Sequence, residues 1–453
     1  MQTACDLSKM KKVYFAGIGG VSMSSLALIL KNKGIGVSGY DFKASETTRM
    51  LEKAGIEIDY SYDKVCLCGF DTVVYTAALG QDDPILCKAR KMKLDIFTRA
   101  ELLGAITGDF KHSVGISGTH GKSSTTGMLT QIMMCAQNDS TILGGAHIPC
   151  INSTYRVGNG ECAVFEACEY KNSYHSMRPT IKVVLNVELD HVDFFGSLEN
   201  VIQSFRQYID TPGKNGENLA VINLDCSNAM EAAAKTGAEI FTFSVNGKAD
   251  FYAKDIDLTS GFGSFTLMKG EKQLCRVSLG VPGIHNVSNA VAASAAASLC
   301  GISSENIKAG LEAFGGVKRR FERVACLENG ALVIDDYAHH PDEIRVTLNS
   351  AKRVAKGKVI CIFQPHTYSR TKALFEDFVS SLSIADKVLL APIYAARETD
   401  TLGVSSDQVA KKIENAECLH SFEELRARAE ELSEKGDLII TMGAGDVYKV
   451  FQG

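Results

Sequence analysis

One local pattern occurs three times along the chain and limits what the chain can fold into. A short apolar run is followed by a tight turn, often rich in glycine, and then by residues with helical periodicity. Strand–loop–helix units of this kind build parallel sheets, and ligands bind outside the carboxyl ends of their strands. The pattern therefore predicts an α/β protein with its sites in the loops after the strands. The three runs lie at Val13–Ala16, Ser113–Ile116 and Ala331–Ile334, with helices expected at Ser22–Leu30, up to Met134, and from about Pro341.

Chain length and further apolar runs predict several domains. At roughly 150 residues per domain, 453 residues suggest about three domains. The stretch 95–109 and the segment from Gly315 to Arg320 are the expected joints. We therefore expect domains at 1–107, 108–316 and 317–453. Additional strands are expected at Thr72–Tyr75, Ala163–Phe165, Val183–Leu185, Val359–Phe363, Lys387–Leu390 and Leu438–Thr441.

Composition excludes several classes of protein. Apolar residues make up 45% and charged residues 22%, which excludes a mostly disordered chain. The formal net charge of -5 argues against binding nucleic acid through bulk positive charge. No run approaches about 18 apolar residues, and the opening residues contain no apolar leader, so a cytoplasmic protein without a membrane segment is expected. A monomer or a homodimer would fit this class.

The 14 cysteines are expected to be reduced thiols, because nothing in the sequence indicates export. Cys66 and Cys68 form a C-x-C pair with no histidine or second pair nearby. This spacing argues against zinc. We expect both side chains to pack as small apolar residues.

The first glycine loop has two interpretations. It runs from Gly17 to Ser22 and departs from the dinucleotide pattern G-x-G-x-x-G at its last position, which is Ser22. Asp41 follows the next strand, about where a carboxylate that binds ribose would lie. Either the loop amides and the helix N-terminus hold a diphosphate, or the glycines only permit a tight turn. The candidate ligand-binding residues are Gly17, Gly19, Gly20, Ser22 and Asp41.

The second loop predicts a phosphate site more strongly. It follows a strand, opens a helix and contains Gly-Lys-Ser, although Ile116 stands where a P-loop glycine is expected and Gly118 replaces it at a shorter spacing. Backbone amides can surround phosphates, Lys122 can neutralise the β/γ oxygens, and Ser123 can bind Mg²⁺. The candidate ATP-binding residues are Gly118, Thr119, His120, Gly121, Lys122, Ser123 and Ser124.

Acidic and imidazole side chains follow the next two strands of the same domain. Carboxylates beside an imidazole at strand ends suit Mg²⁺, which prefers oxygen ligands and retains waters. Single acidic residues in such loops more often cap helices or face solvent, but two clusters beside a phosphate loop favour Glu166 and His191 as ligands. The clusters comprise Glu166 and Glu169, and then Asn186, Glu188, Asp190, His191 and Asp193.

Two polar clusters follow strands of the third segment. One runs from Asp335 to Pro341 and the other from Gln364 to Arg370. Their histidines, tyrosines and arginine suit the binding of a carboxylate and an amine near a reacting phosphate. The alternative is that the histidines cap helices or bond the backbone, and it is strongest for His340.

In their order along the chain, these motifs resemble the Mur ligase family. The resemblance covers essentially the whole chain. It implies a Rossmann-like N-terminal domain that binds a UDP-sugar, a central P-loop ATPase-type domain and a Rossmann-like C-terminal domain that binds an amino acid. The motifs are Gly17-x-Gly-Gly-x-Ser-Met23, Gly118-Thr-His-Gly-Lys-Ser-Ser124, Glu166-Ala-Cys-Glu-Tyr170, Asn186-x-Glu-x-Asp-His191, His285-Asn286-x-x-Asn289, Arg319-Arg-Phe321, Asp335-Asp-Tyr-x-His-His-Pro341 and Gln364-Pro-His366 with Arg370.

The branch of the family that this chain resembles most adds L-alanine to UDP-N-acetylmuramate. There, ATP phosphorylates the sugar carboxylate, the amine attacks the acyl phosphate, and ADP and phosphate leave. The resemblance implies catalytic roles for Lys122, Glu166, His191 and Arg370, and a Mg²⁺ site at Ser123, Glu166 and His191. It further implies ATP contacts at Asn286, Asn289 and Asp336, a UDP-sugar contact at Arg320, and amino-acid contacts at Tyr337, His339, His366 and Arg370.

Departures from the family pattern and competing interpretations refine this hypothesis. Some relatives carry a carbamylated lysine where this chain has Phe205, so no lysine-carbamate metal site is expected. Thr367 stands where many relatives have arginine, which leaves that charge to Arg370. The nearest alternative is the branch that recycles murein tripeptide onto UDP-N-acetylmuramate. A regulatory nucleotide-binding protein with a degenerate ligase site is disfavoured by the intact residues Lys122, Glu166, His191 and Arg370. An NAD(P)-dependent oxidoreductase is disfavoured by Ser22 and by the second loop.

Overall fold

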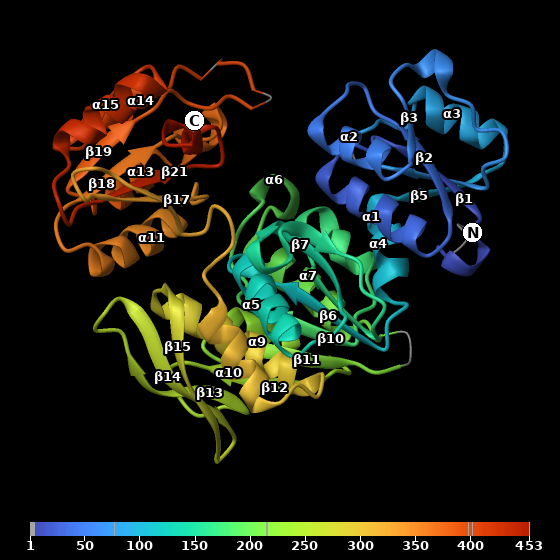
Figure 1. Cartoon of the computed structure of the whole chain (residues 1–453), viewed down its shortest axis with the longest axis horizontal. Coiled ribbons are helices and arrows are strands. Elements are labelled where there is room, and N and C mark those ends of the chain that lie inside the picture. The colour runs from blue at the N-terminus through green and yellow to red at the C-terminus, as the bar shows by residue number, and fades with distance from the viewer. Residues whose placement is uncertain (1–4, 77, 214–215, 397, 401, 453) are drawn as a thin grey trace. The chain divides into compact units, whose positions relative to one another are not determined.

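The computed structural model describes residues 5–76, 78–213, 216–396, 398–400 and 402–452 (Figure 1). The chain divides into two compact units. The first unit comprises Met1–Lys254, Leu267–Cys275 and Ser288–Leu311, and the second comprises Asp255–Thr266, Arg276–Val287 and Glu312–Gly453. No helix in these described ranges is both long enough and apolar enough to cross a membrane.

The described residues form three sheets, and the first belongs to the blue N-terminal part of Figure 1. Its order is β3-β2-β1-β4-β5 and all pairings are parallel. The order reverses between β1 and β4, so the loop after β1 lies at a topological switch point, where ligands bind in open α/β sheets. The strands are Lys12–Ala16, Gly36–Tyr40, Glu57–Asp59, Thr72–Tyr75 and Asp95–Thr98, and the helices α1 to α4 are Val21–Asn32, Glu46–Lys53, Pro84–Lys91 and Arg99–Thr107.

The second sheet has the order β15-β14-β13-β12-β11-β10-β6-β9-β7-β8. Its central strand β6 pairs in parallel with β10 and β9, which follow it in the chain, so the loops after these three strands meet at one sheet edge. The strands β6 to β15 are His112–Ser117, Thr141–Ile148, Ser153–Arg156, Cys162–Glu166, Ile181–Val184, Leu219–Asn223, Glu239–Ser244, Phe251–Asp257, Phe262–Lys269 and Lys272–Pro282. The helices α5 to α10 are Lys122–Cys135, Val192–Phe195, Leu198–Asp210, Ser227–Ala233, Ile284–Leu299 and Ser304–Ala313.

The third sheet lies in the orange to red part of Figure 1 and has the order β16-β17-β21-β18-β19-β20. Among the described strands of this sheet, β16 alone pairs antiparallel, against β17. Alternate residues of β18 face two different apolar cores, one with α11, α13 and α14 and one with α15. The strands β16 to β21 are Glu322–Cys326, Leu332–Asp336, Val359–Phe363, Lys387–Leu390, Ala416–Cys418 and Leu438–Met442, and the helices α11 to α15 are Pro341–Val354, Tyr368–Ala373, Phe375–Leu382, Ser406–Ala410 and Phe422–Leu432.

Short 3₁₀ helices complete the described secondary structure. They lie at η1 Leu7–Lys9, η2 Tyr62–Lys64, η3 Pro149–Ile151, η4 Tyr170–Ser176 and η5 Val447–Val450. The predicted α/β class and each predicted strand are confirmed by these elements, with ends that differ by a few residues. The strands were predictable because β-branched apolar runs flanked by turn residues suit a sheet that is covered on both faces.

The prediction for one cysteine pair is wrong. Cys66 and Cys68 are both exposed, because the buried residues of this segment are their alternating neighbours Val65 and Leu67. In extended backbone successive side chains point to opposite sides, so apolar neighbours facing the core leave the thiols facing solvent. All 14 cysteines lie in the described ranges, and each is a free thiol, as expected.

Candidate active site

The second glycine loop, Gly118 to Gly121, is predicted to bind phosphate and is called the phosphate loop below. It joins β6 to α5 at the centre of the second sheet. Gly121 has a φ of +86°, and a Cβ at this position would lie 2.7 Å from Oδ1 of Asn289. Glycine is therefore required both by the backbone conformation and by the close approach of the asparagine. Gly121, the N-cap residue of α5, makes no side-chain capping bond, so the positive end of the helix dipole can face an anion.

Asn186 holds the loop in this conformation from the end of the neighbouring strand β10. Its side-chain Oδ1 accepts a hydrogen bond of 2.8 Å from the amide of His120, and its backbone oxygen accepts one of 3.2 Å from the amide of Thr119. Thr119 in turn accepts a hydrogen bond from the amide of Glu188 at 2.9 Å. Asn186 and Glu188 thus order the loop with their backbones and the Asn186 side chain.

Lys122, Glu169 and His191 form an ion-paired triad beside this loop. The Lys122 Nζ lies 3.1 Å from Oε2 of Glu169, and Nε2 of His191 lies 3.7 Å from the other carboxylate oxygen. The Lys122 ammonium also donates to the backbone oxygens of Gly118 and Thr119. The Glu169 side chain is only 4% exposed, against 17% for Lys122 and 30% for His191. The carboxylate therefore fixes the lysine from the buried side of the site.

Electrostatics favour the charged form of each member of the triad. Hydrogen bonding to Glu169 raises the pKa of His191. Burial raises the pKa of Glu169, but Lys122 and His191 outweigh burial and leave this pKa below its usual value. Burial likewise lowers the pKa of Lys122, but the Glu169 carboxylate, together with Cys168 and Glu166, outweighs burial, and the net shift is upward. Each charge is thus maintained by its neighbours.

A strained turn presents Glu169 to the lysine. Directly after it, Lys171 and Asn172 have φ values of 53° and 54°, and the Asn172 amide donates to the Glu169 backbone oxygen at 2.9 Å. His191 has a φ of 50° and its ring lies 4.5 Å from the Tyr170 ring. Non-glycine residues in this region cost about 1–3 kcal/mol each and cluster at functional sites.

Glu169 is the residue that the sequence did not assign to the site. The sequence favours Glu166, the other acidic residue of the same cluster, as a metal ligand. In the structure, the Glu166 Oε1 accepts a hydrogen bond of 2.7 Å from the amide of Gly145, at the end of β9. The structure therefore brings Lys122, Glu169 and His191 together, while Glu166 contacts the backbone of β7. The metal roles of Ser123, Glu166 and His191 stay predictions.

The first glycine loop uses most of its amides internally. The amides of Gly17 and Ile18 both donate to the Tyr40 backbone oxygen, at 2.8 and 3.0 Å. The Gly19 amide donates to Oδ2 of Asp41 at 2.7 Å. These contacts favour the tight-turn interpretation for Gly17 to Gly19, and they give the Asp41 carboxylate a partner within the protein.

An anion site at the start of α1 stays a prediction. Gly20, the N-cap residue of this helix, makes no side-chain capping bond, and Arg99 donates from Nη1 to Oγ of Ser22 at 3.0 Å. A guanidinium beside an uncapped helix N-terminus favours a phosphate group. Arg99 could not be found from the sequence, because it lies 77 residues from Ser22 and follows a different strand.

The expected amino-acid residues gather in the second unit. The rings of His339 and His366 lie 6.2 Å apart, and Arg320 lies over the Tyr337 ring at 5.4 Å. Burial lowers the pKa of both histidines, that of His339 to about 4, and the nearby charge of Arg370 lowers both further. Nδ1 of His366 has no hydrogen-bond partner among the described residues although it is buried.

Glu398 is a further member of this cluster that sequence analysis missed. Its carboxylate accepts hydrogen bonds from the amide and hydroxyl of Ser369, and it partly offsets the effects that lower the pKa of His366. The cluster therefore holds neutral imidazoles between a guanidinium and a carboxylate. Such a set can bind a zwitterion and accept a proton from an amine.

Two residues expected at the nucleotide have hydrogen-bond partners within the protein. The Asp336 carboxylate accepts hydrogen bonds from the amides of Phe321 and Ala338, at 2.7 and 2.8 Å. Nδ2 of Asn286 donates to the Pro282 backbone oxygen at 2.8 Å. Their contacts with ATP, and that of Arg320 with the sugar nucleotide, stay predictions. His340 caps α11, as its alternative interpretation holds.

A pH prediction follows from the neutral imidazole of His339. Its pKa is about 4 in the folded protein and about 6.5 when unfolded, so between these values only the unfolded chain binds the proton. Stability should therefore fall by up to about 3 kcal/mol as pH drops through this window. Urea unfolding of the wild type and of His339→Gln at pH 7 and near pH 4.5 measures this. Identical losses in both proteins would contradict it.

Most of the chain matches models of one protein family. Residues 12–111 match the Mur ligase family, catalytic domain, residues 116–297 the Mur ligase middle domain, and residues 319–445 the Mur ligase glutamate ligase domain. The chain is 43% identical over 452 residues to UDP-N-acetylmuramate–L-alanine ligase of Agathobacter rectalis, covering 98% of each chain. The chain belongs to the Mur ligase family. The Mur ligase domains thus contain both glycine loops and the polar clusters described above.

Solved structures of Mur ligases share this fold. The UDP-N-acetylmuramate-alanine ligase of Thermotoga maritima superposes with a TM-score of 0.79 at 27% identity, over 97% of each chain. The murein peptide ligase of Psychrobacter arcticus gives a TM-score of 0.67 at 24% identity, over 98% of this chain and 97% of the other. The second likeness concerns the fold alone.

Proposed function

We propose that this Mur ligase joins L-alanine to UDP-N-acetylmuramate with the energy of ATP. The products are UDP-N-acetylmuramoyl-L-alanine, ADP and phosphate, and the reaction serves peptidoglycan precursor synthesis in the cytoplasm. The observation that carries the proposal is the uncapped start of α5 with Lys122 fixed on Glu169 beside it. A carboxylate resists attack by an amine, and its phosphorylation supplies the leaving group that it lacks. The enzyme must therefore bind a triphosphate, a carboxylate and an amine.

Lys122 and the α5 amides bind the transferring phosphoryl group. The ammonium stabilises negative charge on the β/γ oxygens as the phosphoryl group passes to the sugar carboxylate. Glu169 keeps the ammonium in place and charged, so it is a positioning residue. Asn289, which lies against Gly121, and Asn286 bind the nucleoside side of ATP together with Asp336.

Mg²⁺ is the divalent ion that this site would use. The donor set fits the ion, because the hydroxyl of Ser123 and the carboxylate of Glu166 are hard oxygen ligands, and His191 lies beside the loop next to Glu169. When bound, Mg²⁺ neutralises phosphate charge and orients the triphosphate. Ser123, Glu166 and His191 would hold it, directly or through water.

The second unit supplies the amine. Arg370 binds the alanine carboxylate, and the neutral imidazoles of His339 and His366 accept hydrogen bonds from the amine, with Tyr337 beside them. Neutral rings suit this task because the amine must lose a proton before it attacks. The UDP diphosphate binds at the start of α1 with Ser22 and Arg99, and Arg320 contacts the muramoyl acid or a phosphate.

We assign the UDP-sugar to a domain at 1–107, ATP to a domain at 108–316 and the amino acid to a domain at 317–453. These boundaries place the first glycine loop, the phosphate loop and the histidine cluster in separate domains. Limited proteolysis would cleave near 107 and 316 if the boundaries are right.

Phosphate release tests the substrate assignment. Purified enzyme receives ATP, Mg²⁺ and UDP-N-acetylmuramate, with either L-alanine or murein tripeptide added in parallel. Release is expected only when the sugar nucleotide and alanine are both present. Phosphate release with the tripeptide but not with alanine, each in the presence of the sugar nucleotide, would move the assignment to the recycling reaction. No phosphate release with either alanine or the tripeptide, despite measurable ATP binding, would favour a regulatory role.

A further inference from the structure

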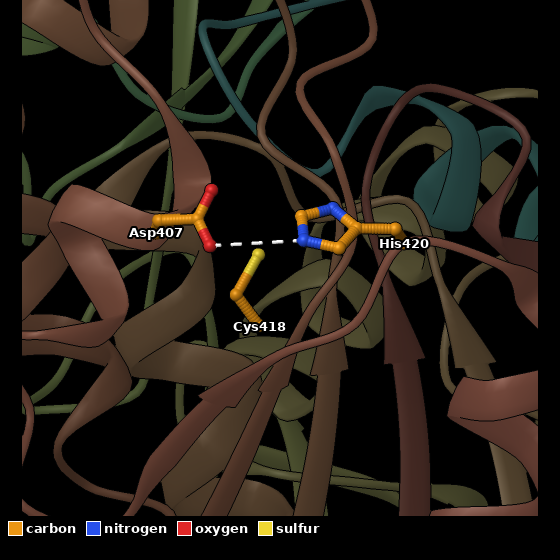
Figure 2. Close-up of side chains that lie close together, drawn as sticks. All are labelled: Asp407, Cys418 and His420. Atoms are coloured by element: carbon orange, nitrogen blue, oxygen red, sulfur yellow. Dashed lines mark ion pairs between the residues drawn. The ribbon is translucent and has the colours of Figure 1, made fainter.

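Three potential metal ligands converge at the edge of the third sheet. Asp407 lies in α14, Cys418 ends the edge strand β20, and His420 follows two residues later. One ligand atom from each side chain lies within 4.8 Å of those of the other two. Figure 2 shows the thiol between the carboxylate and the imidazole, with all three side chains directed toward a common point. None of these residues has a role in the proposed ligase reaction.

Local structure holds each of the three backbones independently. A capping box between Ser405 and Gln408 fixes the start of α14. Cys418 pairs with Leu390 in the sheet ladder. The His420 amide donates to Oε2 of Glu424 at 3.1 Å, just before α15 begins. The arrangement is therefore built into the chain and needs little reorganisation to bind an ion.

The spacing of the ligand atoms suits a small tetrahedral ion. Zinc bonds of 2.0–2.3 Å place ligand atoms about 3.3–3.6 Å apart. Nε2 of His420 lies 3.9 Å from Oδ1 of Asp407. The His420 side chain is 69% exposed and that of Asp407 is 48% exposed, so both can turn slightly and an ion can reach them from solvent.

We propose that Asp407, Cys418 and His420 bind one Zn²⁺, with water as the fourth ligand. Mg²⁺ and Ca²⁺ prefer hard oxygen ligands, and thiolate and imidazole are softer. A set of one thiolate, one imidazole and one carboxylate suits zinc. Coordination replaces the Cys418 thiol proton, which passes to solvent. The ion would join α14 to β20 and to the start of α15. The proposal does not depend on the ligase function.

Cobalt spectroscopy and zinc titration test this site in the full chain. The exposed pair is first removed with Cys66→Ser and Cys68→Ser, because these thiols could also bind zinc. In this background we expect one equivalent of Co²⁺ to give a thiolate-to-cobalt charge-transfer band, which Zn²⁺ then abolishes. Calorimetry should give one tight zinc equivalent, and zinc should raise the midpoint of thermal unfolding.

Variants of the three ligands give the decisive comparison. Cys418→Ser should abolish the charge-transfer band, and His420→Asn and Asp407→Asn should each weaken zinc binding by roughly 10–100-fold or more. Cys326→Ser, at another exposed thiol of the same unit, should change neither. Circular dichroism checks that each variant is folded, and Cys418→Ala provides a second thiol variant. An unchanged band in both Cys418 variants, or no zinc binding in the micromolar range, would overturn the proposal.

Discussion

Replacing Lys122 by methionine should lower kcat by about 10³-fold or more. The methionine fills a similar volume but removes the cation that stabilises charge on the transferring phosphoryl group, an effect of this order when one such donor is lost. The loss should appear mainly in kcat, because the α5 amides still bind the phosphates in the ground state. Steady-state phosphate release at saturating substrates measures it.

A matched control separates this effect from a general loss of charge. Lys111 also pairs with a glutamate, Glu161 at 3.1 Å, but both side chains are more than half exposed. Lys111→Met should therefore retain wild-type kcat. If Lys122→Met also retained at least a tenth of the wild-type kcat, Lys122 would not be the phosphoryl-stabilising cation.

Replacing Glu169 by leucine should destabilise the fold by about 3–5 kcal/mol, because it leaves the buried Lys122 ammonium without its partner. Adding Lys122→Met to Glu169→Leu should restore most of that stability, since two apolar side chains can replace a buried ion pair at little cost. The double variant should nevertheless remain inactive. The double variant is thus expected to regain stability without regaining activity.

Urea unfolding of the two single variants and the double variant measures the coupling. The control pair Lys111→Met and Glu161→Leu should change stability by no more than about 1 kcal/mol, because exposed pairs contribute little. The lowered pKa of Glu169 adds a pH signature. Its stabilising contribution is full above the unfolded pKa of about 4.3 and is lost as pH falls through the lower folded pKa. Additive single effects in the double variant would refute the coupling.

The sequence predicted the structure correctly where the types of neighbouring residues determine it. Runs such as Val359–Phe363 are typical of strands that are buried on both faces, as this one is. The loop from Gly118 to Lys122 contains glycines at positions with φ values of +139° and +86°, which other residues rarely adopt. Fold class and the glycine positions of this loop therefore followed from residue types and spacing, and the binding of phosphate stays a prediction.

The sequence did not predict contacts that depend on how distant segments pack together. The hydrogen bond of 2.7 Å from the Gly19 amide to Asp41 could not be predicted from the sequence, and the ligand contact of Asp41 stays a prediction. Glu169 reaches Lys122 only because of the left-handed turn that follows it. Arg99 reaches Ser22 across two strand–helix units. Such partners depend on tertiary packing, which spacing along the chain does not encode.

Oxygen transfer from the sugar carboxylate tests carboxyl activation most directly. UDP-N-acetylmuramate labelled with a heavy oxygen isotope in its carboxylate is converted with ATP and L-alanine, and the products are analysed by mass spectrometry. If the carboxylate attacks the γ-phosphorus of ATP, the released inorganic phosphate must carry one labelled oxygen, and with Lys122→Met this labelled phosphate should form about 10³-fold more slowly. Label in AMP, or released phosphate without label despite product formation, would contradict the proposed acyl-phosphate route.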